Sequence, residues 1–596
     1  MEKIHLVATS SIEAWSKTKK NILIGGWCNN YLDKAKYKNY NFKIIQSTLG
    51  NRCEKKNIKI ANNGREQINT LLNYFVLFLN RFHKTEFSHR YWSIILQPWI
   101  SEFVAFYNAV TQRLEIISRN YRIESATCSY FEDDIYLPND YNEAKKFLGT
   151  ESSYFNKLTY EIFKHFHSND VKINFIKKEE KDSGEKNRSE LRDVEKSSFK
   201  QKIRDVILKL FDNFPILDNK PFIIGSALPY YEDFLLKISN FQFPKYIRFI
   251  KAEKIQISHT QRNQTHDLLD TKCIDNFEQI SFLFNLAFRY LPTCYLEGYN
   301  LNKKKMKSLN WPENPKYIFT SVNHYFDEIF KFYAAEKVEK GTPYYLGQHG
   351  QGFSTHNCFW KHIETVTSDK FLAWGSEKIS ENSVSLFNLR KPKKNNKNKV
   401  SKKGILLITE SAEIETQLFS EMYDFQNEKF EFLSSFVETL NNELRNQVTV
   451  RLYHDDTNNF CFEEKKWKDF DPAIKLDIRL LPFEKMISQN RVTIFCYDST
   501  GFLETVSQNI PALLYFHKND FENMLDSEVI KDYQKLKEAK ILFNSHKELS
   551  DHINNIWEDV NYWWESAITI EAINSFRNKY CATNKNPIIT LNKILK

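Results

Sequence analysis

A glycine-rich segment, residues 346–352 (LGQHGQG), holds three of the chain's fifteen glycines. It follows an apolar run typical of a strand, and glycine at such a place lets a ligand approach the backbone closely. The imidazole of His349 titrates near neutral pH, so we predict a catalytic role for it as a general base, or a contact to phosphate or to an acceptor sugar. Its neighbours Gly347, Gln348 and Gly350 are predicted to bind the ligand. The alternative is a turn in which His349 only hydrogen-bonds the backbone.

A second candidate, residues 498–504 (DSTGFLE), lies where an expected strand gives way to a helix. Hydroxyl groups and free backbone N–H groups at a helix N-terminus form a cradle for phosphate, and a carboxylate in the next turn can reach ribose hydroxyls. The residues that we expect to contact a nucleotide donor here are Asp498, Ser499, Thr500, Gly501 and Glu504. The alternative is helix capping, with Glu504 favoured by the helix dipole, and both interpretations can hold at once.

Two further pairs of polar residues follow expected strands. Arg451 and His454 lie in the run 448–454, where a histidine suits a phosphate contact or a base. Glu232 and Asp233 follow the expected strand 221–225 and are candidates for an acidic catalytic base. The alternative for these two acids is stabilisation of a helix N-terminus.

Several kinds of site are disfavoured by the sequence. It has no Walker lysine loop, no H-E-x-x-H pair and no G-x-S-x-G turn, which argues against an ATPase, a zinc protease and an esterase. The nine cysteines are scattered without a C-x-x-C pair, as expected for the reduced thiols of a cytoplasmic protein. Adjacent carboxylates such as Asp455 and Asp456 are usually solvated. We therefore expect no metal site and no cofactor apart from the donor substrate.

Two polar segments divide the chain. Residues 177–200 are almost entirely polar or charged, and residues 391–403 hold seven lysines and no acid, so both are predicted to be linkers. They separate an N-terminal region (1–176), a middle domain (201–390) and a C-terminal domain (404–596). Outside the lysine-rich segment, basic residues are mixed with acids, so we expect no nucleic-acid partner and at most a peripheral contact with a membrane.

Short apolar runs alternate with helical patterns through the middle and C-terminal domains. The expected strands are 221–225, 246–250, 317–320, 344–347 and 366–374, followed by 404–410, 448–454, 476–481, 492–498, 512–516 and 541–543. The N-terminal region shows one strand, 21–25, and is otherwise mainly helical. This alternation predicts an α/β fold with two doubly wound, Rossmann-like domains that face a cleft, and a ligand at the carboxyl ends of their strands.

The chain also resembles the transferases of bacterial O-antigen and surface-carbohydrate gene clusters. The segments that carry this resemblance are 6–15, 23–28, 91–99, 347–350, 498–511 and 555–564. A looser likeness links 499–511 to the C-terminal motif of capsule-polysaccharide transferases that use CMP-activated, Kdo-type sugars. Those enzymes and bacterial sialyltransferases carry a His-Pro pair for the donor phosphate, whereas this chain has Asp455 after His454.

The resemblance implies a GT-B-like, metal-independent glycosyltransferase with its donor nucleotide on the C-terminal domain. We expect it to transfer a sugar, favoured as a CMP-activated nonulosonate or Kdo-like sugar, to a bacterial surface glycan or a protein acceptor. In this scheme His454, Ser499 and Thr500 hold the donor phosphate, and Glu504 holds the ribose. The alternatives are a polyol-phosphate transferase of similar fold and a non-catalytic carbohydrate-binding or envelope-assembly protein. Polysaccharide biosynthesis of this kind takes place in the cytoplasm or at the inner face of the membrane.

Overall fold

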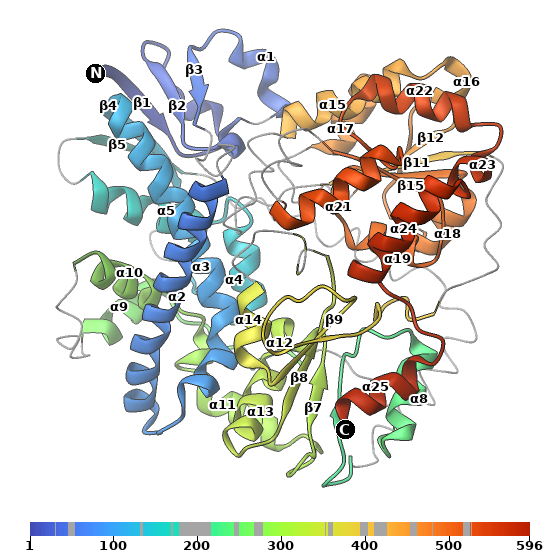
Figure 1. Cartoon of the computed structure of the whole chain (residues 1–596). Helices are drawn as coiled ribbons and strands as arrows, with labels where there is room; N and C mark the ends of the chain where they lie inside the picture. The colour runs from blue at the N-terminus through green and yellow to red at the C-terminus, as the bar shows by residue number, and fades with distance from the viewer. Residues whose placement is uncertain are drawn as a thin grey trace.

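The computed structural model contains three β-sheets whose strands are all parallel, with helices packed on them (Figure 1). The residues that the structure describes are 1–29, 31–45, 54–130, 135–167, 171–177, 216–243, 250–267, 278–351, 353, 355, 361–393, 403–410, 426–452, 462–479, 481–516, 525 and 527–596. Most of the two predicted linkers therefore lies outside the described residues. Within the described ranges, no helix combines the length and the apolar character that crossing a bilayer requires.

The C-terminal sheet has six strands in the order β13-β12-β11-β14-β15-β16. Their bounds are β11 (Ile405–Ile408), β12 (Val448–Arg451), β13 (Lys475–Asp477), β14 (Val492–Phe495), β15 (Ala512–Tyr515) and β16 (Leu542–Phe543). Each corresponds to a predicted strand, and β11, β14 and β15 are buried along their whole length, as central parallel strands are. The strand order reverses between β11 and β14, which makes this sheet doubly wound.

The middle sheet has five strands in the sequential order β6-β7-β8-β9-β10. Their bounds are β6 (Phe222–Ile223), β7 (Ile318–Thr320), β8 (Tyr344–Gly347), β9 (Lys370–Ala373) and β10 (Ser383–Ser385). The predicted strand 366–374 begins too early, because its first two residues end helix α14 (Lys361–Thr367). The predicted strand 246–250 lies outside the described residues except for its last residue.

Neighbouring residues of the middle strands belong to two different hydrophobic cores. Ile318 and Phe371 pack in the core that includes the N-terminal region, whereas Phe319 and Leu372 pack in the core of the C-terminal domain. Successive side chains of a strand point to opposite faces of its sheet. The middle sheet is therefore a layer between the other two parts of the molecule.

The N-terminal region contains a five-stranded sheet besides its predicted helices, in the order β3-β2-β1-β4-β5. The strands are β1 (Glu2–Val7), β2 (Lys20–Leu23), β3 (Phe42–Ile44), β4 (Tyr121–Tyr130) and β5 (Lys172–Lys177), and the main helices are α2 (Glu54–His83), α3 (His89–Asn120), α4 (Tyr141–Leu148) and α5 (Ser153–Phe166). The sequence predicts only β2, because β1 and β4 mix polar with apolar residues and give no continuous apolar run. Helix α3 also packs against α13 (Glu328–Glu339) and so joins this region to the middle sheet.

The end of the chain returns from the C-terminal domain to the middle domain. After α24 (Ala567–Tyr580), the last helix α25 (Pro587–Leu595) lies beside α8 (Tyr230–Ser239) (Figure 1). Asn240 Nδ2 donates a hydrogen bond to Asn592 Oδ1 at 2.6 Å. The C-terminal tail thus fixes the two domains that carry the predicted site residues against one another.

Candidate active site

The phosphate-cradle candidate lies at the point where the C-terminal sheet reverses its strand order. Helix α19 (Thr500–Ser507) begins just after β14, and ligands of doubly wound folds bind outside the carboxyl ends of strands at such a switch point. Ser499 is the N-cap of α19, and its Oγ accepts a hydrogen bond from Phe502 N at 3.1 Å. The capping alternative is therefore confirmed for Ser499. No hydrogen bond within the described part of the chain engages the N–H groups of Thr500 and Gly501, so these groups can bind an anion.

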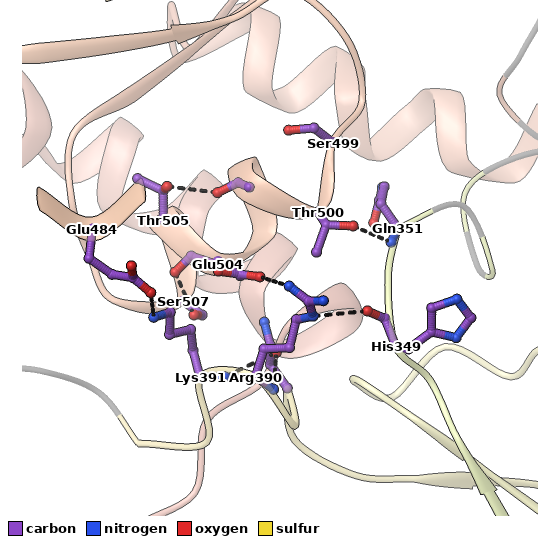
Figure 2. Close-up of polar contacts among 12 residues, drawn as sticks. His349, Gln351, Arg390, Lys391, Glu484, Ser499, Thr500, Glu504, Thr505 and Ser507 are labelled. Carbon is purple, nitrogen blue, oxygen red and sulfur yellow. Dashed lines mark hydrogen bonds and ion pairs between the residues drawn. The ribbon is translucent and has the colours of Figure 1, made fainter. Parts of the chain in front are cut away.

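The glycine-rich loop of the middle domain reaches this helix N-terminus directly. Gln351 N donates a hydrogen bond to Thr500 Oγ1 at 3.0 Å (Figure 2). A Cβ atom at Gly350 would lie 3.1 Å from Thr500 Oγ1, so the glycine allows the loop to come this close to the side chain of Thr500. Residues that are 149 positions apart in the sequence therefore form one site.

Asp498 is the centre of a hydrogen-bond network that crosses between the two domains. Its Oδ1 accepts from the hydroxyl of Tyr533, on α21 (Ser527–Glu538), at 2.6 Å. Its Oδ2 accepts from Gln351 Nε2 at 2.6 Å and from Thr355 Oγ1 at 2.9 Å. With both oxygens engaged by the protein, Asp498 holds the loop and the helix together, a role that the sequence did not predict for it.

Glu504 is held by Arg390, a residue for which the sequence predicts no role. Its carboxylate is buried, and Oε1 accepts from Arg390 Nη1 at 3.0 Å. Arg390 Nε also donates to the backbone carbonyl of His349 at 3.1 Å (Figure 2). Arg390 thus connects the ribose candidate Glu504 to the predicted catalytic loop, and its guanidinium brings positive charge close to α19.

The start of the lysine-rich segment continues this row of ion pairs. Lys391 Nζ lies 2.8 Å from Glu484 Oε1, and Lys393 Nζ lies 3.4 Å from Glu232 Oε1. Exposed pairs of this kind contribute little stability individually. Together with Arg390, they align residues 390–393 along the boundary between the middle and C-terminal domains.

The two acids Glu232 and Asp233 lie in the first turn of α8, as the helix-dipole alternative predicts. Asp233 Oδ1 accepts from Ser226 Oγ at 2.6 Å, and Oδ2 pairs with Lys237 Nζ at 2.7 Å. Both carboxylate oxygens of Asp233 are therefore engaged within its own helix and the preceding loop. The structure links Glu232 to Lys393 rather than to His349.

Three of the predicted binding residues have clear packing roles. Gln348 is buried; its Oε1 accepts from Trp374 N at 2.8 Å, and its Nε2 donates to the carbonyl of Gly350 at 2.9 Å. A Cβ atom at Gly347 would lie 2.3 Å from Ser321 Oγ, and one at Gly501 would lie 2.9 Å from the ring of Phe483. These glycines therefore permit close packing of the protein against itself.

Among the described residues, no hydrogen bond or ion pair joins Arg451 to the glycine-rich loop. Arg451 is buried at the end of β12, where it forms an ion pair with Asp477 on β13 and donates to the carbonyl of Leu481 at 3.2 Å. Its guanidinium therefore ties two neighbouring strands together. His454 lies outside the described residues, so its predicted phosphate contact stays a prediction.

His349 is partly buried and lies on the middle-domain side of the site. Figure 2 shows its imidazole turned away from the Arg390–Glu504 pair, which its backbone carbonyl faces. Burial lowers the pKa of His349 to about 4, and the nearby His324, Arg390 and Lys145 act in the same direction. The imidazole is therefore neutral at pH 7 and able to accept a proton.

Two polar residues behind His349, His324 and Glu364, are not predicted as site residues from the sequence. His324 is in α12 (Asn323–Phe326), just after β7, and Glu364 is in α14. His324 Nε2 lies 3.3 Å from Glu364 Oε1, and both side chains are buried. The sequence does offer a signal for His324, because this residue comes shortly after a predicted strand, at the same edge of the sheet as His349. It offers no such signal for Glu364.

The parallel sheets, with helices packed on them and a polar site at the carboxyl ends of their strands, define an α/β protein with Rossmann-like sheets. Its family follows from the sequence: a model described as the LIC12162 family transferase matches residues 4–595. The chain belongs to this family and is a transferase.

More distant comparisons add little. No curated protein matches the chain. The structure of Anabaena HepE in complex with UDP and glucose aligns at 10% identity and a TM-score of 0.31, covering 64% of this chain and 98% of that one. The spinosyn rhamnosyltransferase SpnG complexed with spinosyn aglycone aligns at 10% identity and a TM-score of 0.28, covering 63% and 100%. At these TM-scores the likenesses carry no argument about substrates.

Proposed function

We propose that this chain is a glycosyltransferase that moves a sugar from a nucleotide donor to a bacterial surface glycan or a protein acceptor. The support is its membership of a transferase family together with the contact between the glycine-rich loop and α19. The observation that carries the proposal is the hydrogen bond from Gln351 N to Thr500 Oγ1, because it joins the loop of the candidate base to a helix N-terminus at a topological switch point.

In the proposed donor site, the hydroxyl of Thr500 and the first N–H groups of α19 bind the donor phosphate. Arg390 adds a fixed positive charge beside them. Such preorganised donors stabilise the negative charge that develops on the departing phosphate, which is the task of a metal ion in other transferases. Glu504, held in place by Arg390, stays our candidate for the ribose hydroxyls. His454 stays our candidate for a second phosphate contact.

His349 is the proposed base that activates the acceptor hydroxyl. Its pKa of about 4 keeps the imidazole unprotonated at neutral pH. Asp233 is already bound to Ser226 and Lys237, and Glu232 to Lys393, so neither acid is as available. A positioned general base contributes about 10²–10⁴ in rate.

The proposed donor is a CMP-linked nonulosonate or Kdo-like sugar. This choice rests on the resemblance of residues 499–511 to capsule-polysaccharide transferases and on nothing else. The enzyme would act without a metal, at the inner face of the membrane or in the cytoplasm, in surface-polysaccharide biosynthesis.

Calorimetric titration of the full chain with CMP, UDP, GDP and ADP tests the donor site. We expect CMP to bind, and the Thr500→Val variant to bind it at least tenfold more weakly. Thr505→Val is the matched control, since Thr505 is on the same helix but its Oγ1 donates to the carbonyl of Gly501 at 2.7 Å (Figure 2). Tight binding of UDP or GDP but not CMP would reject the proposed donor, and no nucleotide binding would reject the glycosyltransferase.

Product analysis separates the remaining alternatives. Glycosyl transfer leaves the donor phosphate on the nucleotide, whereas a polyol-phosphate transferase leaves phosphorus on the acceptor. Glycan binding without consumption of any donor would instead indicate a carbohydrate-binding protein.

A further inference from the structure

A buried cluster of three titratable side chains lies behind the glycine-rich loop. It consists of His349 after β8, His324 in α12 and Glu364 in α14. One side-chain nitrogen or oxygen of each residue lies within 4.8 Å of those of the other two. His324 is 4% exposed and Glu364 is fully buried, so the cluster is shielded from bulk water.

Among the residues that the structure describes, each member of the cluster has a polar atom that meets no partner with hydrogen-bond geometry, although the hydroxyl of Tyr325 lies close to Glu364. These atoms are His324 Nδ1, His349 Nδ1 and Glu364 Oε2, all of them buried. Buried polar atoms in folded proteins are normally paired, so three such atoms in one place indicate a function rather than a packing accident. The shortest contact, 3.3 Å between His324 Nε2 and Glu364 Oε1, already has the length of a weak hydrogen bond.

The charge of Glu364 acts on His349. The carboxylate raises the pKa of His349, and His349 in turn lowers the pKa of Glu364, which burial raises to about 7. Burial lowers the pKa of His324 to about 3, so this second imidazole is neutral. Other groups that act electrostatically on the two histidines are the cations Arg390, Lys145 and Lys331. Burial keeps the neighbouring hydroxyl of Tyr325 un-ionised by raising its pKa far above the ordinary value.

We propose that Glu364, together with His324, is a positioning pair for the base His349. The negative charge of Glu364 stabilises the imidazolium that forms on His349, and the 3.3 Å contact from His324 Nε2 holds the Glu364 carboxylate in place. The carboxylate of a Ser-His-Asp triad acts on its histidine in the same way. Catalytic hydrogen bonds of this kind often tighten only when the substrate is bound.

This inference rests on the proposed function, in which the acceptor hydroxyl gives its proton to the imidazole of His349. The acceptor oxygen then forms a bond to the anomeric carbon of the donor sugar. The bond from that carbon to the phosphate oxygen breaks, and its electron pair leaves with the nucleotide. The imidazolium of His349 carries a positive charge during this step, and Glu364 is the nearby carboxylate that opposes it.

The same residue types would also suit a zinc ion. Two histidines and one carboxylate form the ligand set of some catalytic zinc sites, in which ligand atoms at about 2.1 Å from the metal lie closer to one another than 4.8 Å. The three cations around this cluster disfavour a further divalent charge. Zinc is therefore an outcome for the experiment to reject.

The Glu364→Gln variant tests the pair, with diethyl pyrocarbonate as the probe because it modifies unprotonated imidazole nitrogen. Modification of His349, followed by peptide mass spectrometry, should be slower in the variant at pH 8, because the imidazole loses the neighbouring negative charge that raises its basicity. In the wild type, the rate at His349 should rise as pH rises through about 7, where Glu364 acquires its charge. The variant should lack this rise.

A matched control is Glu151→Gln, which alters another buried carboxylate, in the N-terminal region. It should leave the modification rate of His349 and its pH profile unchanged. If Glu364→Gln fails to fold, Glu364→Ala is the second variant, and the rate at His349 should also fall in it. An unchanged rate and pH profile in folded variants would overturn the proposal.

Two further measurements separate this inference from the proposed function. Stoichiometric zinc in the purified wild-type chain that is lost in Glu364→Gln would overturn the positioning pair in favour of a metal site. CMP titration of Glu364→Gln should give the wild-type affinity. If no nucleotide binds the wild type, the proposed function fails. If nucleotide binds but the modification rate of His349 is the same in Glu364→Gln as in the wild type, only the positioning pair is refuted.

Discussion

The N-terminal and C-terminal sheets share one topological feature and use it differently. Both reverse their strand order beside their first strand, between β1 and β4 and between β11 and β14. At the N-terminal switch point, Glu151 accepts hydrogen bonds from the hydroxyls of Thr9 at 2.5 Å, Ser10 at 2.5 Å and Ser129 at 3.0 Å. The polar groups that could receive a ligand there are therefore bound to the chain's own carboxylate.

The C-terminal switch point instead faces another domain. Thr500 meets the glycine-rich loop, and Glu504 meets Arg390, so the groups at α19 contact residues that come from the middle of the chain. The difference indicates that switch-point topology alone does not make a ligand site. A site also needs a second surface that approaches the switch point, and at α19 the glycine-rich loop and Arg390 supply it.

The largest expected effect is on transfer at the C-terminal switch point. Arg390→Ala removes the fixed charge beside α19, and we expect kcat to fall by about 100-fold, as when one preorganised donor is removed. Lys391→Ala is the control, because Lys391 pairs with Glu484 on α18 (Phe483–Gln489) and should leave kcat within a factor of two. Equal kcat values for the two variants would show that Arg390 does not contribute to transfer.

The second prediction concerns the N-terminal switch point, where Glu151→Gln should affect folding and not binding. Hydrogen bonds to a buried charged group contribute about 1.5–3 kcal/mol, so we expect the free energy of unfolding to fall by about 2 kcal/mol in urea titrations. The affinity for the nucleotide should remain that of the wild type. A weaker nucleotide affinity in a folded variant would show that the two switch points are coupled.

A smaller effect is expected for Gly347→Ala, which tests whether this glycine serves packing. The added Cβ would approach Ser321 Oγ and the side chain of Leu389, which lies 2.7 Å from it. Overpacking of this kind costs about 1–3 kcal/mol, measurable as a lower midpoint of thermal unfolding. Normal stability with lost nucleotide binding would return Gly347 to the ligand site.

The smallest effect is a pH dependence in the N-terminal sheet. Burial lowers the pKa of His5, on β1, below its ordinary value of 6.5, and its ring contacts Ser125 and the carbonyl of Ala14. The unfolded chain therefore takes up the proton first, so the stability from this group is present above pH 6.5 and is lost as pH falls below it. His5→Asn should flatten the loss of unfolding free energy between pH 7 and pH 5.

The sequence predicts the C-terminal domain well and the N-terminal region poorly. Strands such as β11 (ILLI) and β15 (ALLY) are short apolar runs between helical patterns, and this alternation predicts a parallel sheet. Strand β4 (YRIESATCSY) carries serine, threonine and glutamate, so its ten residues look no more like a strand than like a loop. The helical periodicity of the long helices around β4 dominates the sequence pattern of this region, so the sheet on which they pack is not predicted.

The candidate site shows the same limit. Local patterns identify the loop around His349 and the helix start at Thr500, because glycine, hydroxyl and strand-end signals lie within a few residues. They do not identify Arg390 or the Glu364–His324 pair, whose roles depend on contacts over 40 residues or more. Gln348 and Arg451 are predicted as binding residues because their side chains can hydrogen-bond a ligand. The structure shows that each instead connects the end of its strand to the neighbouring strand.

Hydrogen exchange with bound nucleotide tests the central claim most directly. The full chain is compared with and without CMP, or with whichever of UDP, GDP and ADP binds in calorimetry. Ligand contact slows exchange of backbone amides that it shields or rigidifies. The account predicts slower exchange in residues 498–507 and 346–351, with residues 7–11 and 127–130 unchanged. Protection at the N-terminal switch point, with none at α19, would contradict it.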